Sequence, residues 1–139
     1  MILGIGIDLV SVHRIRRLRE RRGMRGLERL LTARELEHCL AQASSWPSLA
    51  ARVAAKEAYY KAIGTGVGHH GGWRDVEVAR RDNGRPLLIL HGPAARHARE
   101  RGVTRVHLAL THTDDVAAAT VTLEGVEPPD DVGPPTAEI

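Results

Sequence analysis

The sequence predicts one α+β domain in which an antiparallel sheet packs on a long buried helix. Three observations predict this class. An alternating apolar segment opens the chain, helical patterns fill residues 13–63, and strand patterns around a tight turn follow residue 73. At 139 residues, the chain is long enough for one hydrophobic core and too short for two ordinary domains.

The first predicted element is a strand over residues 2–10. One face carries bulky apolar side chains, at Leu3, Ile5, Ile7 and Leu9. The other face is cleared by Gly4 and Gly6 and ends in Asp8. Glycine inside a strand often marks close approach by a ligand or another backbone, so we expect Asp8 to lie beside open space. The alternative is a tightly packed strand whose final aspartate marks the start of the next helix.

Two helical patterns follow this strand. Residues 13–31 form a basic helical segment that we expect to be interrupted near Gly23 and Gly26. Residues 32–42 form a short helix that opens with a Thr32–Glu35 capping box, in which each residue satisfies a backbone amide of the other.

The longest uninterrupted helical pattern covers residues 49–63, after a loop at residues 44–48. Ser48 is the expected N-cap and Gly64 the left-handed stop. On a wheel of about 100° per residue, alanines stand where a surface helix would carry polar side chains. They are Ala50, Ala51, Ala54, Ala55, Ala58 and Ala62. A helix that is apolar all round is buried all round, in a core or against another subunit.

From Trp73 onward the pattern is mainly β. Strands are predicted over residues 76–79, 87–90, 103–110 and 116–123, and a short helix over residues 93–101. The sequence Asp82-Asn83-Gly84 predicts a hairpin turn between the first two of these strands. Residues 125–139 carry four prolines and four acidic residues, so we expect a domain at residues 1–124 followed by a disordered, acidic and proline-rich tail.

Composition narrows the class of protein. Cys39 is the only cysteine, so no disulfide can form within the chain, and a reducing, cytoplasmic location is expected. No basic segment precedes the apolar start, and no apolar run approaches the roughly 20 residues that span a bilayer. We therefore expect a soluble protein with no secretory signal and no membrane partner.

Charge is unevenly distributed, although the formal net charge is only +3. Between Arg14 and Arg29 the chain has eight arginines, against Glu20 and Glu28. This pattern favours a surface for an acidic partner, which could be DNA, RNA, a membrane face or an acidic protein; a solvated basic helix is the alternative. With two Trp, two Tyr and no Phe, the chain has no evident base-stacking platform.

Four charged residues lie on the long, otherwise apolar helix: Arg52, Lys56, Glu57 and Lys61. Buried charges are costly unless they are paired or bound to a metal or an anion. A ladder of i,i+4 pairs on this helix explains Glu57 with Lys61 but leaves the other two unexplained. Lys56 and Lys61 are also the only lysines in the chain, beside 18 arginines, which favours a site for a compact ammonium group.

A glycine-containing loop follows this helix directly, at Gly64, Thr65 and Gly66. Its backbone amides can approach a phosphate closely. Asp8 and Glu57 supply the oxygen ligands that Mg²⁺ prefers, with phosphates completing the shell. The residues therefore predict a magnesium-dependent enzyme, or a binder, that takes a phosphorylated small molecule.

Four motifs together resemble one family. They are GIGIDLV at the start, AAKEAYYKAIGTG in the long helix and loop, NGRP at the turn, and THTDDVAAATV in the last strands. Over residues 1–124 the chain is similar to the holo-acyl-carrier-protein synthases, the small type of 4′-phosphopantetheinyl transferase. The resemblance implies that fold and a Mg²⁺-dependent reaction. In it, the 4′-phosphopantetheine arm of coenzyme A moves to a serine of an apo-acyl carrier protein of fatty-acid or polyketide synthesis, and adenosine 3′,5′-bisphosphate is released.

The resemblance also implies roles for individual residues. Asp8 and Glu57 would bind Mg²⁺. Coenzyme A would be contacted from the long helix, the glycine loop and a late strand, by Arg52, Lys56, Lys61, Gly64, Thr65, Gly66 and His112. Lys61 would act beside the phosphates, and the serine proton would go to Glu57 through a metal-bound water or to His112. Since His112 shares a strand face with apolar residues, a buried and satisfied histidine is the alternative.

The same resemblance gives the basic helix a partner. The family docks its acidic acyl carrier protein on this helix, which assigns Arg14 by its position, and Arg17 and Arg21 by charge alone. It also implies a homotrimer with active sites between subunits, which agrees with a helix that has no solvent face.

The chain departs from the family pattern at three places. Ser11 replaces a common acidic residue, which removes a third metal contact, while Val53 and the Tyr59-Tyr60 pair change the size of packed side chains. Two alternatives to an enzyme are considered: a nucleic-acid-binding protein, suggested by the pI of 9.6, and a non-catalytic module that binds carrier proteins. The nucleic-acid-binding alternative leaves the buried charged helix unexplained, and the retained Asp8, Glu57 and Lys61 argue against the non-catalytic module.

Overall fold

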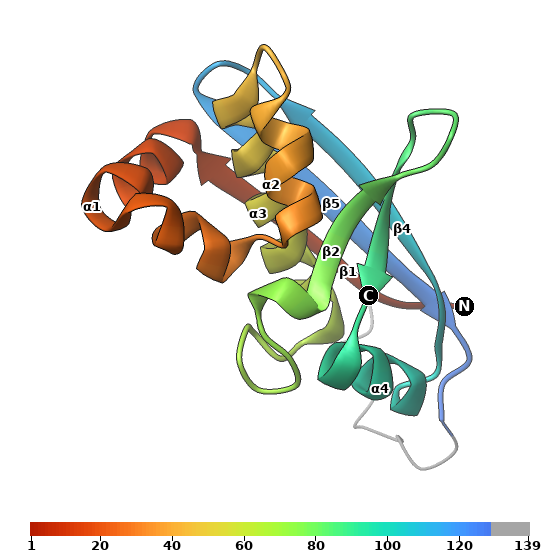
Figure 1. Cartoon of the computed structure of the whole chain (residues 1–139). Helices are drawn as coiled ribbons and strands as arrows, with labels where there is room; N and C mark the ends of the chain where they lie inside the picture. The colour runs from red at the N-terminus through yellow and green to blue at the C-terminus, as the bar shows by residue number, and fades with distance from the viewer. Residues whose placement is uncertain (129–139) are drawn as a thin grey trace.

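The computed structural model describes residues 1–128 and combines two antiparallel sheets with four α-helices (Figure 1). In chain order the elements are β1 (Ile2–Ser11), α1 (Val12–Leu30), α2 (Ala33–Leu40), α3 (Ser45–Ile63), the 3₁₀ turn η1 (Trp73–Asp75), β2 (Val76–Arg80), β3 (Pro86–Leu90), α4 (Gly92–Glu100), β4 (Val103–His112) and β5 (Val116–Gly125). One sheet has the order β1-β5-β4, and β2 pairs with β3 in the other. The predicted α+β class is confirmed.

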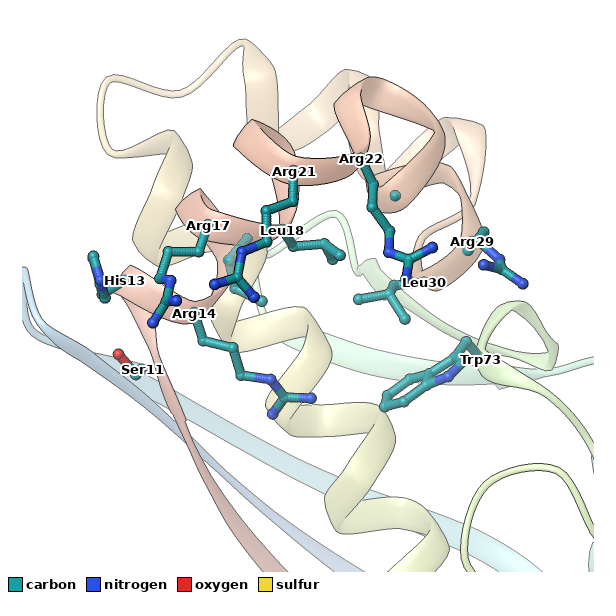
Figure 2. A pocket seen from close by; sticks show the side chains of 12 residues that line it. Ser11, His13, Arg14, Arg17, Leu18, Arg21, Arg22, Arg29, Leu30 and Trp73 are labelled. Atoms are coloured by element: carbon teal, nitrogen blue, oxygen red, sulfur yellow. The ribbon is translucent and has the colours of Figure 1, made fainter.

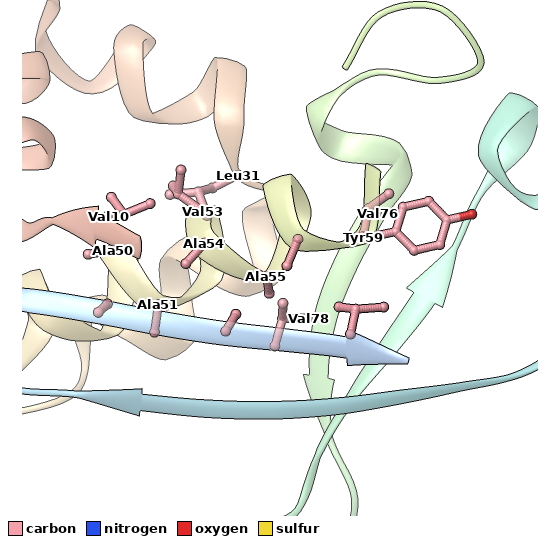
Figure 3. Close-up of a cluster of buried hydrophobic side chains, with 14 of the residues drawn as sticks. Val10, Leu31, Ala50, Ala51, Val53, Ala54, Ala55, Tyr59, Val76 and Val78 are labelled. Atoms are coloured by element: carbon pink, nitrogen blue, oxygen red, sulfur yellow. The ribbon is translucent and has the colours of Figure 1, made fainter. Parts of the chain in front are cut away.

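Helix α3 forms the centre of the core, packed on β1 and β5 (Figure 3). The packing is close because the glycine face of β1 lies directly on the helix. A Cβ atom at Gly4 would overlap the carbonyl oxygen of Ala62, and one at Gly6 that of Ala58. The cleared face of the strand thus admits the backbone of a helix, so the tightly packed strand is the correct alternative, and Gly4 and Gly6 do not open space for a ligand. The predicted long buried helix on an antiparallel sheet is confirmed.

The bulky face of β1 points away from this core. Ile5, Ile7 and Leu9 are 67%, 61% and 66% exposed, respectively, although they belong to a regular strand. Strand β1 also lies at the edge of its sheet. An edge strand with a row of exposed aliphatic side chains is typical of a surface that another chain covers.

The predicted start of the long helix was wrong, and the predicted interruption of the basic helix is confirmed at Gly23 but not at Gly26. Helix α3 begins at Ser45, not at residue 49, with Ser44 as its N-cap, so the expected loop at residues 44–48 is largely helical. Pro47 can occupy the third helical position because the first-turn N–H groups have no acceptor within the helix. Helix α1 is interrupted at Gly23, where φ is 64°, but it continues through the buried Gly26.

Other local predictions are confirmed. The capping box of α2 is present, with Thr32 N donating to Glu35 Oε1 at 2.9 Å. The hairpin turn closes with Gly84 N donating to the carbonyl of Arg81 at 2.8 Å. Strand β5 continues to Gly125, and the expected tail beyond residue 128 lies outside the described residues. Within residues 1–128, no helix is long and apolar enough to cross a membrane.

Candidate functional site

The site begins with an ion pair between β1 and α3. Lys61 Nζ donates to Asp8 Oδ1 at 2.6 Å and to the carbonyl of Ile7 at 3.2 Å. The Asp8 side chain is only 10% exposed, while Lys61 is 58% exposed. The second oxygen of Asp8, Oδ2, is buried and has no hydrogen-bond partner among the described residues. The described residues therefore leave the hydrogen-bonding capacity of this oxygen unsatisfied.

Glu57 lies beside Asp8, one turn before Lys61 on α3. Arg14 of α1 donates to Glu57 Oε1 at 3.2 Å. Burial, together with the neighbouring Asp8 carboxylate, raises the pKa of Glu57 to about 7. The fold thus holds the two carboxylates close together, and the positive charges of Lys61 and Arg14 compensate their negative charges.

The two carboxylates, Asp8 and Glu57, fit a divalent cation whose other ligands are phosphate oxygens and waters. Among residues 1–128, no group of three or more His, Cys, Asp or Glu side chains could hold a metal by itself. Mg²⁺ is commonly held by one or two carboxylates, with phosphates and waters filling the other positions. Such a cation would satisfy the unpartnered Asp8 oxygen and would relieve the mutual repulsion of Asp8 and Glu57.

Lys56 does not reach this site, which corrects its expected role in contacting coenzyme A. Its side chain is fully buried, and its ammonium donates to Glu35 Oε1 at 2.7 Å and to the carbonyls of Val76 and Trp73 at 2.7 and 3.0 Å. All three protons of the ammonium thereby have acceptors. Lys56 is a structural residue that joins α3 to α2, η1 and β2.

Arg52 and His112 lie together, but apart from Asp8. Together with Arg80 they line a hollow of about 320 Å³. Arg52 is 2% exposed and donates to Ser48 Oγ at 3.1 Å, while its Nε has no partner among the described residues. His112 is exposed, so the alternative of a buried, satisfied histidine is wrong. At about 100° per residue, the side chains of Arg52 and Lys61 project from opposite sides of α3.

The glycine loop begins where α3 ends, one turn beyond Lys61. Gly64 has a φ of 84° and forms the left-handed cap. Thr65 Oγ1 donates to the carbonyl of Gly66 at 3.2 Å, and both glycines are exposed. The predicted loop residues thus lie at the end of the helix that carries Glu57 and Lys61.

The expected carrier surface borders a cavity of about 980 Å³ (Figure 2). Arg14, Arg17 and Arg21 all line it from α1, and Trp73 lines it from η1 on the opposite side. Sequence reasoning missed Trp73, because no periodic pattern connects η1 with α1. It also missed Glu35 as the partner of Lys56; the only signal was a glutamate in a capping box.

Comparison with known proteins gives one consistent match. The family model of the 4′-phosphopantetheinyl transferase superfamily matches residues 4–121. A holo-[acyl-carrier-protein] synthase of Koribacter versatilis is 47% identical over 124 residues, 89% of this chain and 99% of the relative. One of Desulforudis audaxviator is 50% identical over 119 residues, 86% of this chain and 90% of the relative.

Solved structures of the same kind are similar in fold. A crystal structure of holo-[acyl-carrier-protein] synthase from Neisseria meningitidis has a TM-score of 0.83 at 35% identity, covering 89% of this chain and 99% of that one. The Helicobacter pylori enzyme in complex with coenzyme A has a TM-score of 0.76 at 28% identity, covering 86% of this chain and 99% of that one.

Proposed function

This chain belongs to the 4′-phosphopantetheinyl transferase superfamily, as a holo-[acyl-carrier-protein] synthase, and from that premise we propose how its residues divide the work. The enzyme transfers the phosphopantetheine arm of coenzyme A to an acyl carrier protein. A bond forms between the serine oxygen of the carrier and the β-phosphorus of coenzyme A. The bond from that phosphorus to the bridging oxygen breaks, adenosine 3′,5′-bisphosphate leaves, and the serine loses one proton.

The observation that carries the proposal is the pair of carboxylates, Asp8 and Glu57, beside Lys61. The two carboxylates would hold Mg²⁺, and the ion when bound would neutralise charge on the diphosphate. Asp8 Oδ2 has no competing partner among residues 1–128, so it is free for this role. The absence of an acidic side chain at Ser11 leaves these two as the protein's ligands.

Lys61 is proposed to bind the transferring phosphate. Its ammonium is exposed and is hydrogen-bonded to Asp8. Rotation of the lysine side chain alone would bring the ammonium to an incoming diphosphate, with no change in the helix. A lysine placed there stabilises the negative charge that develops on the phosphoryl group and the leaving group. The loop at Gly64, Thr65 and Gly66 would present its backbone amides along the same ligand.

Arg52 and His112 are proposed to serve the active site of a neighbouring subunit. Arg52 and His112 lie on the side of α3 opposite to Lys61. A single protomer therefore does not bring Arg52 and Lys61 to the same diphosphate. A trimer with active sites between subunits removes this difficulty, and the exposed Ile5, Ile7 and Leu9 of β1 offer the apolar surface for it. The serine proton then has two candidate acceptors, Glu57 within the chain and His112 from the neighbour.

The acidic carrier is proposed to dock on the arginine side of α1. Arg14 connects this surface to the reaction centre because it lines the cavity and donates to Glu57. A docked carrier would therefore lie next to the carboxylates. We propose a cytoplasmic location, where the free Cys39 would stay reduced.

The test is to incubate the protein with Mg²⁺, coenzyme A and an apo-acyl carrier protein and to weigh the intact carrier. The wild type should add one phosphopantetheine arm, and removal of Mg²⁺ with a chelator should abolish the gain. Glu57→Gln should lose activity at least about 10²-fold. Glu37→Gln on the exposed face of α2 is the matched control and should react normally. Normal transfer by Glu57→Gln would contradict the assigned role.

A further inference from the structure

Arg14 belongs to two sites at once. It lines the cavity of about 980 Å³ from α1, beside Arg17 and Arg21, and its side chain is 53% exposed. Its guanidinium extends toward α3 (Figure 2), where Nη2 donates to Glu57 Oε1 at 3.2 Å. Of the described residues that line this cavity, Arg14 alone donates a hydrogen bond to Asp8 or Glu57. It is therefore the residue through which a partner in the cavity can act on the two carboxylates.

We propose that Arg14 is a switch that couples docking of the acidic carrier to the binding of Mg²⁺. In the free enzyme its guanidinium holds Glu57 and opposes the cation. A carboxylate of the docked carrier takes over the guanidinium and releases Glu57. The inference rests on the proposed docking of the carrier on α1 and on the proposed metal ligands, Asp8 and Glu57. It adds that the metal site reaches its full affinity only when the carrier is in place.

Arg14 competes with a cation for Glu57. Its guanidinium occupies Oε1 of Glu57, an oxygen that a metal would otherwise bind. Its charge also acts on both carboxylates: burial acts to raise the pKa of Asp8 and of Glu57, and the positive charge of Arg14 opposes the rise in each. A positive charge that stabilises two carboxylates repels a cation that approaches them. Removal of this charge should therefore tighten metal binding.

The bond between Arg14 and Glu57 is weak enough to be exchanged. It uses one of the five N–H donors of the guanidinium, and Arg14 is the more exposed partner. Exposed ion pairs contribute little free energy. A carboxylate on a docked partner can instead form two parallel hydrogen bonds with a guanidinium, which is the stronger arrangement. Reorientation of one side chain, with no movement of α1 or α3, is then enough to free Glu57 Oε1.

Coupling of this kind is reciprocal: if the carrier raises the affinity for the metal by some factor, the metal raises the affinity for the carrier by the same factor. Arg17 and Arg21 line the same cavity, but neither hydrogen-bonds to Asp8 or Glu57 in the part of the chain that the structure describes. Loss of Arg17 should weaken docking and leave the coupling intact. Arg17→Gln is therefore the matched control for Arg14→Gln.

The experiment measures binding of Mn²⁺, which prefers the same oxygen ligands as Mg²⁺, by the loss of the electron paramagnetic resonance signal of the free ion. Each protein is titrated alone and with a saturating apo-acyl carrier protein whose acceptor serine is replaced by alanine. Coenzyme A is left out, and metal bound by the carrier by itself is measured separately and subtracted. In the wild type the carrier should tighten Mn²⁺ binding about fivefold or more. Mn²⁺ should tighten carrier binding, measured by calorimetry, by the same factor.

Arg14→Gln should bind Mn²⁺ about fivefold or more tighter than the wild type does without the carrier, and the carrier should no longer change that affinity. Arg17→Gln should bind the carrier more weakly but keep the wild-type affinity for Mn²⁺ and the full coupling. Unchanged Mn²⁺ affinity in Arg14→Gln, or a carrier effect that persists in this variant, would overturn the switch.

Glu57→Gln separates failure of the switch from failure of the proposed metal site. If Glu57→Gln binds Mn²⁺ as tightly as the wild type, Glu57 is not a metal ligand, and the proposed site and the switch both fail. If Glu57→Gln loses Mn²⁺ binding while Arg14→Gln behaves as the wild type, the metal site stands and the switch alone is overturned.

Discussion

Lys61 Nζ lies 2.6 Å from Oδ1 of Asp8, although 53 residues separate them in sequence. The contact exists because Gly4 and Gly6 let β1 lie against the backbone of α3. It gives the lysine a resting position beside the carboxylates and keeps it exposed for a ligand. The hydrogen bond to Asp8 and the negative charge of its carboxylate raise the pKa of Lys61.

Replacing Lys61 should therefore affect turnover more than stability. Lys61→Ala should lower kcat about 10²-fold, because it removes one preorganised donor to the transferring phosphate. The free energy of unfolding should fall by a smaller factor, because Lys61 is 58% exposed although Asp8, at 10%, loses its ion-pair partner. Steady-state kinetics and urea unfolding on the same sample check both statements. A large loss of stability with normal kcat would contradict them.

Lys56 is expected to behave in the opposite way. Lys56→Met leaves the buried Glu35 unpaired and should cost about 3–5 kcal/mol of unfolding free energy. The further change Glu35→Leu should recover part of that loss, because no buried charge then remains uncompensated, although the amides of Thr32 and Val78 lose their acceptor. Chemical denaturation of the two variants is the measurement. If the second change adds to the damage, the two side chains are not coupled as described.

The contact between β1 and α3 can be tested at Gly6. Gly6→Ala places a Cβ atom where the Ala58 carbonyl oxygen lies, and should destabilise the protein by about 1–3 kcal/mol. Gly72→Ala is the control, since Gly72 has a φ of −100° and an added Cβ would meet only Asp75 Oδ2 at 3.7 Å. Thermal unfolding should show a clear fall in Tm for the first and little change for the second.

Glu77 should make stability depend on pH. Burial acts to raise its pKa, but the hydrogen bonds from Thr32 and His91 outweigh it, and the pKa is lowered from its usual 4.5. A carboxyl with a lowered folded-state pKa stabilises the fold above its unfolded pKa, and that contribution is lost as pH falls through the folded value.

Glu77→Gln should accordingly be less stable than the wild type at neutral pH. The difference should shrink as pH falls below about 4.5, where the wild-type carboxyl begins to bind its proton in the unfolded chain. Urea midpoints measured across this range are the check. A difference that grows toward acid would have the wrong sign for this account.

The two neighbouring tyrosines should differ although both are buried. Tyr60 Oη donates to the carbonyl of Gly72 at 2.7 Å, whereas Tyr59 Oη is buried without a partner among residues 1–128. Tyr60→Phe should cost about 0.5–1.5 kcal/mol, and Tyr59→Phe should be neutral or stabilising because it removes an unsatisfied hydroxyl. Thermal unfolding of the two variants is the measurement. Equal losses of stability would contradict the difference in hydrogen bonding between the two hydroxyls.

Much of the fold could be predicted from local patterns. The capping box at Thr32, the turn at Gly84 and the left-handed stop at Gly64 each depend on a few adjacent residues, and all are present. The start of α3 could not be predicted in this way. A proline at position 47 suggests a loop from the sequence, yet the first turn of a helix tolerates it at no cost in hydrogen bonds.

The candidate site could likewise be predicted only in part from the sequence. The sequence by itself determined the residue types that can act on a phosphate: the carboxylates of Asp8 and Glu57, a lysine on the long helix, and the glycine loop that follows this helix. Only the tertiary structure decided that Lys61 meets Asp8 while Lys56 meets Glu35, and that Arg52 lies with His112 on the far side of α3. The physical reason is that one helix presents successive charges about 100° apart, so their partners come from whichever elements pack on each side. Those elements lie far away in sequence, and only their packing brings them to the helix.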